Sequence, residues 1–202
     1  MSAEAPAVDK RRQILDAAIR VFARQGFHAC RVSDIADEAG VAYGLVYHYF
    51  KSKDQVLNEL FGERWSLLLT AIEEVDGQPI GGREKLDSVA RFIIDSYRYD
   101  PELMKVIIVE VTRAANSFGR THLPDIRRAY DLIAKIVSDA QAAGEFRRDV
   151  DPEFASMWFY GAIEQLLSGW VFDLIGHTDA DFTQARQMVV ETICGGIDAR
   201  SG

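Results

Sequence analysis

Apolar residues recur at intervals of three and four along nearly the whole chain, which is the repeat of one face of an α-helix. Ile14, Ala18 and Phe22 mark the first such face, and Gly26 follows it as a residue that favours a helix end. The sequence lacks the alternating runs with Asn-Gly or Asp-Gly turns that indicate β-hairpins. The pattern predicts an all-α fold of about nine helices, the first over residues 10–25.

Two short helices are predicted next, over about residues 32–39 and 42–49, joined by the tight turn Ala39-Gly40-Val41. Two short helices that are joined by a tight turn and supported by a longer helix form a helix-turn-helix. Its second short helix enters the major groove of DNA. We therefore expect a disordered tail over residues 1–9 and a helix-turn-helix DNA-binding domain over residues 10–53.

The rest of the chain, residues 54–202, is predicted to be a larger helical bundle. Two of its helices open with the triplet Asp-Pro-Glu, at residues 100–102 and 151–153. In such a triplet Asp accepts hydrogen bonds from the first backbone N–H groups, Pro presets the first helical dihedral angle, and Glu interacts favourably with the helix dipole. A last helix is expected over about residues 179–197.

The helix expected over about residues 153–175 is apolar over almost the length needed to cross a bilayer. It carries Glu164 near its middle, and an acidic charge at mid-bilayer costs roughly 2.5–3.5 kcal/mol. We therefore expect a helix that is buried on nearly all sides within the protein, and no membrane association.

The net charge is −8, yet residues 1–53 carry eight Lys and Arg against six Asp and Glu. Contact with a polyanion is therefore assigned to this first quarter of the chain. Cys30 and Cys194 lack metal-ligand spacing and no signal segment is visible, which favours a cytoplasmic protein. The four histidines are scattered and no glycine-rich phosphate loop is present, so we expect no catalytic residue, metal ion or cofactor.

The second short helix carries three tyrosines and a histidine, and two lysines follow it. Hydroxyl and amine groups are suited to DNA phosphates, so Tyr47 and Lys53 are the expected backbone contacts. The alternative is that the aromatic side chains pack the joint between this helix and the next. We assign Val46 and Phe50 to that packing role.

The stretch from about Arg11 to Leu60 resembles the TetR family of transcriptional repressors. The shared segments are ILDAA at residues 14–18, FARQGF at 22–27, VSDIADEAGV at 32–41 and GLVYHYFKSK at 44–53. The resemblance implies a repressor, not an enzyme, that binds a palindromic operator as a homodimer. It also implies a helical ligand-binding and dimerisation domain, in which a small apolar effector changes the spacing of two DNA-reading heads.

Two departures from the family pattern change the expected DNA contacts. Cys30-Arg31 stands where the family usually has Thr followed by Ser or Thr, so Arg31 becomes a phosphate contact. The turn Ala42-Tyr43-Gly44-Leu45 lacks the usual hydroxyls, and its Tyr and Leu indicate apolar contact with a thymine methyl group. The residues expected to face DNA are Arg31, Ser33, Ala42, Tyr43, Gly44, Leu45, Tyr47, His48, Lys51 and Lys53. The departures also leave open a helical interaction module without a DNA target.

Segments at residues 109–116, 144–152 and 159–171 resemble the FadR-type, fatty-acid-degradation branch of the family, which releases DNA on binding long-chain acyl-CoA. Such a ligand needs a long apolar slot and cations for its phosphates. The residues expected to bind it are Phe92, Ile107, Ile108, Val111, Arg113, Asn116, Arg120, Arg127, Tyr130, Phe159, Ile163 and Leu167. A different apolar effector, such as a drug or a metabolite, stays open, as does an ordinary core role for each aliphatic residue.

In the family the last two helices of each subunit form a four-helix dimer interface, which explains a helix that is apolar all round. The residues expected in this interface are Trp158, Gly161, Ala162, Gln165, Gly169, Met188 and Ile193. A two-fold dimer also suits DNA reading, because two heads about 34–36 Å apart face successive major grooves.

Overall fold

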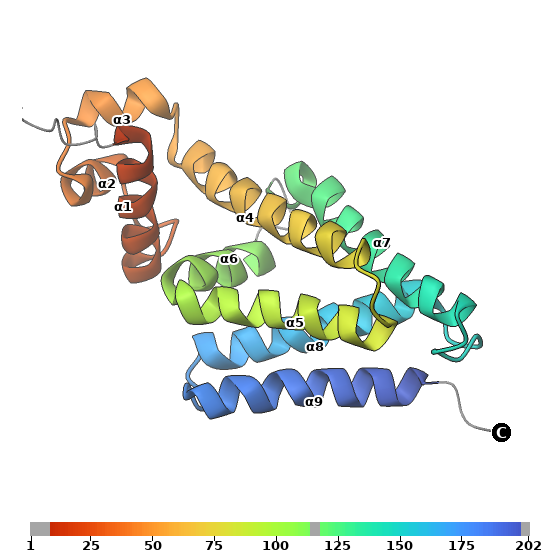
Figure 1. Ribbon diagram of the computed structural model, residues 1–202. Coiled ribbons are helices and arrows are strands. Elements are labelled where there is room, and N and C mark those ends of the chain that lie inside the picture. The colour runs from red at the N-terminus through yellow and green to blue at the C-terminus, as the bar shows by residue number, and fades with distance from the viewer. Residues whose placement is uncertain (1–8, 114–117, 199–202) are drawn as a thin grey trace, which may run out of the picture.

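The computed structural model describes residues 9–113 and 118–198, with the side chains of residues 110–120 left aside. These residues form nine helices and no strand, as Figure 1 shows, which confirms the predicted all-α fold. The helices are α1 (Lys10–Gln25), α2 (Val32–Ala39), α3 (Tyr43–Tyr49), α4 (Lys53–Asp76), α5 (Gly82–Tyr99), α6 (Pro101–Arg113), α7 (Phe118–Ala142), α8 (Pro152–Val171) and α9 (Asp179–Ile197).

The helices gather around two hydrophobic cores, which divide the molecule into a head (residues 10–60) and a body (residues 61–197). The head core is formed by α1 to α3 together with the first two turns of α4, where Val56 and Leu60 are buried. From Phe61 onward the buried residues of α4 belong to the body core. The head core thus extends beyond residue 53, where the sequence pattern placed the domain boundary.

The body is built around α5, which contacts α4, α6, α7, α8 and α9. Figure 1 shows α9 along one edge of the molecule with α8 beside it and α4 along the opposite edge, and α7 packs against both α4 and α8. Ile93 of α5, Ile133 of α7 and Phe159 of α8 are almost completely buried between them.

The two Asp-Pro-Glu triplets open helices as predicted. The Asp100 carboxylate accepts a hydrogen bond from the backbone N–H of Leu103 at 3.0 Å. The Asp151 carboxylate accepts from the N–H groups of Glu153 and Phe154 at 2.8 and 3.3 Å. Each aspartate therefore satisfies helix N–H groups that have no partner inside the helix.

The C-terminal end of α8 differs from the prediction, because the helix ends at Val171 and not near residue 175. The indole N–H of buried Trp170 donates to the carbonyl of Gly176 at 2.9 Å, and Asp173 adopts a left-handed φ of 56°. This loop-closing bond turns the chain back toward the body. As a result Leu174, which was expected inside the helix, lies exposed in the loop.

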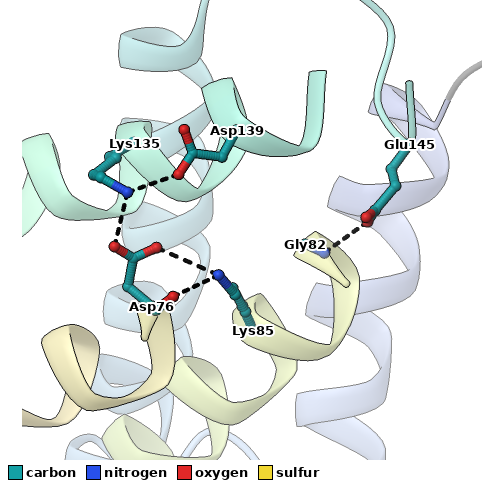
Figure 2. A network of polar contacts seen from close by, with 6 residues as sticks. All are labelled: Asp76, Gly82, Lys85, Lys135, Asp139 and Glu145. Atoms are coloured by element: carbon teal, nitrogen blue, oxygen red, sulfur yellow. Dashed lines mark hydrogen bonds and ion pairs between the residues drawn. The ribbon is translucent and has the colours of Figure 1, made fainter. Parts of the chain in front are cut away.

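A polar network fastens the body at the end that lies away from the head (Figure 2). Asp76, the last residue of α4, binds the amine of Lys85 on α5 through its backbone carbonyl at 2.6 Å. Its carboxylate binds the amine of Lys135 on α7 at 2.9 Å. Nearby, the backbone N–H of Gly82 donates to the Glu145 carboxylate at 2.6 Å. The remote ends of α4, α5 and α7 are therefore held together.

The close approach of chains at Gly82 gives a stability prediction. A methyl group at this position would overlap the Cβ of Ala140 and lie 3.2 Å from Cε2 of Phe146. We expect Gly82→Ala to lower the free energy of unfolding by about 1–3 kcal/mol through overpacking. The control is Gly62→Ala in the middle of α4, where the added methyl group meets no atom within 4 Å. That change should raise the free energy by about 0.5–1 kcal/mol.

Urea unfolding followed by circular dichroism, at one fixed protein concentration, measures both variants. Equal stabilities of the two variants would show that the contact at Gly82 relaxes without cost.

Candidate functional site

The turn between α2 and α3 sets the outward face of the head. Gly40 ends α2 with a left-handed φ of 62°, a conformation that costs a glycine little. The following helix then inserts Val46 and Phe50 into the head core, each 1% exposed. These two residues have the packing role that the sequence assigned to them. The opposite face of α3 is left open to solvent.

Most of the residues expected to meet DNA are exposed to solvent, on α3 and on the segments next to α2 and α3. Arg31, Ala42, Tyr43, Gly44, Tyr47, His48 and Lys51 are exposed, whereas Ser33, Leu45 and Lys53 are partly buried. Tyr43 and Tyr47 form a pair with their rings edge to face, 5.0 Å between centroids, and with 3.2 Å between their hydroxyl oxygens. The pair holds two hydroxyl groups in a defined position on the surface of α3. That these residues contact DNA stays a prediction.

Arg31 occupies the N-cap position of α2, where the family usually has a hydroxyl residue. One half of a capping box remains, because the Asp34 carboxylate accepts a hydrogen bond from the Arg31 backbone N–H at 2.7 Å, and the Asp34 backbone N–H donates to the Arg31 carbonyl at 3.1 Å. The Arg31 side chain makes no capping hydrogen bond and lies exposed at the start of α2. Sequence reasoning had noted the lost hydroxyl but not the part played by Asp34.

Lys53 is placed differently from what the sequence suggested. Its ammonium group donates to the backbone carbonyls of Phe27 at 2.6 Å, Cys30 at 2.9 Å and His28 at 3.2 Å. It also lies 4.7 Å from the centre of the Phe27 ring, within the range of a cation–π contact. Because an ammonium group has three N–H donors, these carbonyls use all of them. Lys53 thus joins the start of α4 to the loop between α1 and α2.

Other basic residues of the head also bind within the protein. Arg20 and Arg24 of α1 both bind Glu38 of α2, at 2.7 and 3.0 Å, and these hydrogen bonds lower the pKa of the Glu38 carboxyl. By contrast, none of the ion pairs found among the described residues involves Arg31 or Lys51. Their charges are exposed, that of Arg31 at the start of α2 and that of Lys51 just after α3.

The apolar residues expected to bind an effector lie together in the body. Phe92, Ile107, Ile108, Phe159, Ile163 and Leu167, from α5, α6 and α8, all belong to the body core or pack against it. Arg127 and Tyr130 of α7 line a groove of about 450 Å³ between α7 and α8. Asn116 and the side chains of Val111, Arg113 and Arg120 lie outside the described part of the structure. The binding role of all these residues stays a prediction.

One face of α8 and α9 is apolar and exposed. Trp158 is 69% exposed, Met157 54% and Met188 63%, and nothing lies within 4 Å of a methyl group added at Gly161. Of the other residues predicted for a dimer interface, Gln165 is exposed and Ala162 and Ile193 are partly buried. Gly169 does not lie on this face, because it is buried against Ile175 of the following loop.

Helix α6 carries side chains into both cores, a feature that sequence reasoning missed. Val106 is 3% exposed and belongs to the head core, where α6 packs on α1. The next residue, Ile107, belongs to the body core, and Leu103 packs against both cores. Helix α6 therefore joins the packing of the body to the packing of the head.

Within the part of the chain that the structure describes, no group of three His, Cys, Asp or Glu side chains is arranged to hold a metal ion. None of the helices described is both long and apolar enough to cross a bilayer. The thiols of Cys30 and Cys194 are buried, and burial raises the pKa of Cys194 to about 11.

Comparisons with known proteins agree with this division into head and body. Residues 14–60 match the family model described as bacterial regulatory proteins, tetR family. Residues 83–193 match the tetracyclin repressor-like C-terminal domain. The chain is 30% identical, over 189 residues, to a fatty acid metabolism regulator protein of Bacillus subtilis (strain 168), and the match covers 93% of this chain and 95% of that protein.

Two solved structures resemble the whole chain. The fatty acid degradation regulator FadR from Bacillus halodurans has a TM-score of 0.84 at 26% identity, and the match covers 98% of this chain and 100% of that one. FadR from Bacillus subtilis in complex with stearoyl-CoA has a TM-score of 0.82 at 27% identity, covering 92% of this chain and 98% of that one.

The different positions of Lys51 and Lys53 give a test with a matched pair of variants. We expect Lys53→Met to lower the free energy of unfolding by about 1–3 kcal/mol, because three carbonyls lose their donor. The salt dependence of DNA binding should be the same for Lys53→Met as for the wild type. Lys51→Met should leave stability nearly unchanged and reduce the salt slope by about 1, as expected for one lost phosphate contact.

Fluorescence anisotropy at several salt concentrations measures the slopes, and urea unfolding measures the stabilities. If Lys53→Met reduced the salt slope and left the stability unchanged, Lys53 would be a contact of the DNA backbone after all.

Proposed function

The chain belongs to the TetR family of bacterial regulatory proteins, and from this premise we propose a homodimeric repressor of fatty acid metabolism that long-chain acyl-CoA releases from its operator. The Bacillus subtilis relative is named for that regulation, and its solved structure contains stearoyl-CoA. The observation that carries the proposal is the position of α6, which has residues in the cores of both head and body. A ligand in the body is thereby connected to the head.

The proposed mechanism depends on where the body is free to move. An acyl chain that enters the body core has to displace packed side chains, and Ile107 and Ile108 of α6 are among them. The remote end of α4 is fastened through Asp76, so the movement occurs at the end next to the head. When α6 is displaced, Val106 moves with it, and so does the surface of α1 that packs on α6. The ligand favours the conformation in which the body is open, and DNA favours the other one.

The proposed dimer interface is the exposed apolar face of α8 and α9. Exposed apolar area of this kind, contributed by Phe154, Met157, Trp158 and Met188, is unusual on a monomer and is buried when two copies meet. Gly161 allows the two backbones to approach closely. A two-fold axis at this face would present both α3 helices to one side of the duplex, as a palindromic operator requires.

The effector proposal is tested on a palindromic fragment from the promoter region of the protein's own gene. We expect stearoyl-CoA to dissociate the protein–DNA complex, whereas CoA alone and stearate do not. Electrophoretic mobility shift at fixed salt measures the bound fraction. A complex that persists at saturating stearoyl-CoA would remove acyl-CoA as the effector, while a fragment that is never shifted would count against the repressor itself.

The interface proposal predicts that Trp158→Glu converts the dimer into monomers, because it places a charge in the apolar face. The mass measured by light scattering should fall from twice 22.6 kDa to 22.6 kDa, and binding to the palindrome should weaken strongly. Leu67→Glu on α4 is the control, since Leu67 is 59% exposed and lies outside the proposed interface. A dimeric Trp158→Glu variant would place the interface elsewhere.

A further inference from the structure

Arg64 of α4 is a half-buried cation at the border of the body core. Its guanidinium lies over the ring of Phe92 at 5.0 Å, and among the described residues no hydrogen bond or ion pair involves it. A guanidinium has five N–H donors and loses their hydration when it is buried. Burial lowers the pKa of Arg64, and the nearby groups that act on it are Tyr160 and Asp100. Among the described residues, the donors of this guanidinium are therefore not taken up by hydrogen bonds or ion pairs.

Tyr160 lies close enough to Arg64 to act on its charge, and Tyr130 and Glu164 lie close to Tyr160. Tyr160 of α8 stacks on Trp65 with 6.0 Å between ring centroids. The ring of Tyr130 of α7 meets the Tyr160 ring edge to face, with 5.4 Å between centroids.

Burial raises the pKa of Tyr130, Tyr160 and Glu164. The two tyrosine hydroxyls are hydrogen-bond donors at neutral pH. Among the described residues, the one fully buried side-chain nitrogen or oxygen without a hydrogen-bond partner is Oε1 of Glu59, so the polar atoms of this cluster of Arg64, Tyr130, Tyr160 and Glu164 are not sealed off from a ligand or from solvent. The cluster thus combines a cation with two hydroxyl donors.

The position of the cluster relative to the core is that of a binding site for an amphipathic molecule. Along α8, Tyr160 and Glu164 each follow by one position the fully buried residues Phe159 and Ile163. The apolar core therefore begins directly beside the polar groups. A molecule with an apolar chain and an oxygen at its end matches this order of surfaces.

We propose that Arg64 and the hydroxyls of Tyr130 and Tyr160 bind the acyl oxygen of the effector, with the hydrocarbon chain in the body core. The inference rests on the proposed function and names the group of the ligand that the body recognises. An acyl oxygen has two lone pairs and accepts hydrogen bonds from donors of this cluster without bringing a second charge beside Arg64. A ligand that lacks the oxygen forgoes these hydrogen bonds, so the site discriminates against it.

The test compares two ligands that differ in this oxygen alone. Stearoyl-CoA carries the carbonyl oxygen, and the thioether S-octadecyl-CoA has the same chain, sulfur and phosphates without it. We expect the wild-type protein to bind stearoyl-CoA at least about tenfold more tightly than the thioether, as for one hydrogen bond to a charged group. In Arg64→Met the two dissociation constants, measured by calorimetry, should become nearly equal.

Three controls separate recognition from folding. Arg91→Gln, an exposed arginine on the side of α5 that carries the Asp87 ion pair, should keep the wild-type discrimination. Tyr160→Phe keeps the ring on Trp65 and should reduce the discrimination in part. Arg64→Met should also melt at a higher temperature than the wild type in the absence of ligand, because a buried unpaired charge is removed.

The outcomes are distinct. Equal loss of affinity for both ligands in Arg64→Met would assign the arginine to the phosphates or to packing and overturn the proposal. Equal binding of both ligands by the wild type would overturn it as well, and would leave the acyl-CoA response intact. If the wild type binds neither ligand, the proposed effector itself fails and the acyl-oxygen site with it.

Discussion

The packing of α6 against α1 is the contact on which the two parts of the molecule depend. Val106 lies in the head core, while Met104 and Ile107 of the same helix lie in the body core. A helix moves as a unit. If the packing of the body displaces α6, the head therefore has to move with α6 or lose its contact with it. The second connection, α4, is continuous through both cores and is fastened at its remote end. In the proposed mechanism, these restraints turn a change of volume in the body into a rotation of the head.

Two features of the free protomer are expected to lower its stability. Each is accounted for by a proposed partner, a second copy of the chain or a ligand. The apolar face of α8 and α9 exposes Trp158 and Met188 to water, and burial against a second copy in the proposed dimer would remove that cost. Arg64 is partly buried without an ion pair among the described residues, and in the proposed site a ligand oxygen would supply an acceptor. Proteins commonly retain such locally unfavourable residues where they bind something.

Much of the fold follows from local sequence signals, and the exceptions follow from contacts between distant residues. The bounds of α1 and α2 were predicted correctly, because Gly26 and Gly40 end these helices through their own backbone conformations. The end of α8 was predicted four residues too late, since it depends on the bond from Trp170 to the carbonyl of Gly176. No periodic pattern carries that information.

In the candidate functional site, too, some features follow from local sequence signals and others from contacts between distant residues. The exposed face of α3 could be predicted from the turn and the tyrosines beside it, whereas the use of the Lys53 amine by three loop carbonyls could not. Arg64 is a single arginine in an otherwise ordinary helix. Only the folded body places it beside Phe92 and Tyr160, and nothing in the sequence around it signals a binding role.

The distance between the two heads of the dimer tests the coupling through α6 most directly. Gln25 is exposed at the end of α1, so Gln25→Cys accepts a spin label, while Cys30 and Cys194 are buried. Double electron–electron resonance then gives the distribution of distances between the two labels with and without stearoyl-CoA. The account predicts that ligand binding shifts the distribution away from the one measured on operator DNA. An unchanged distribution in protein that has bound the ligand and released DNA would contradict it.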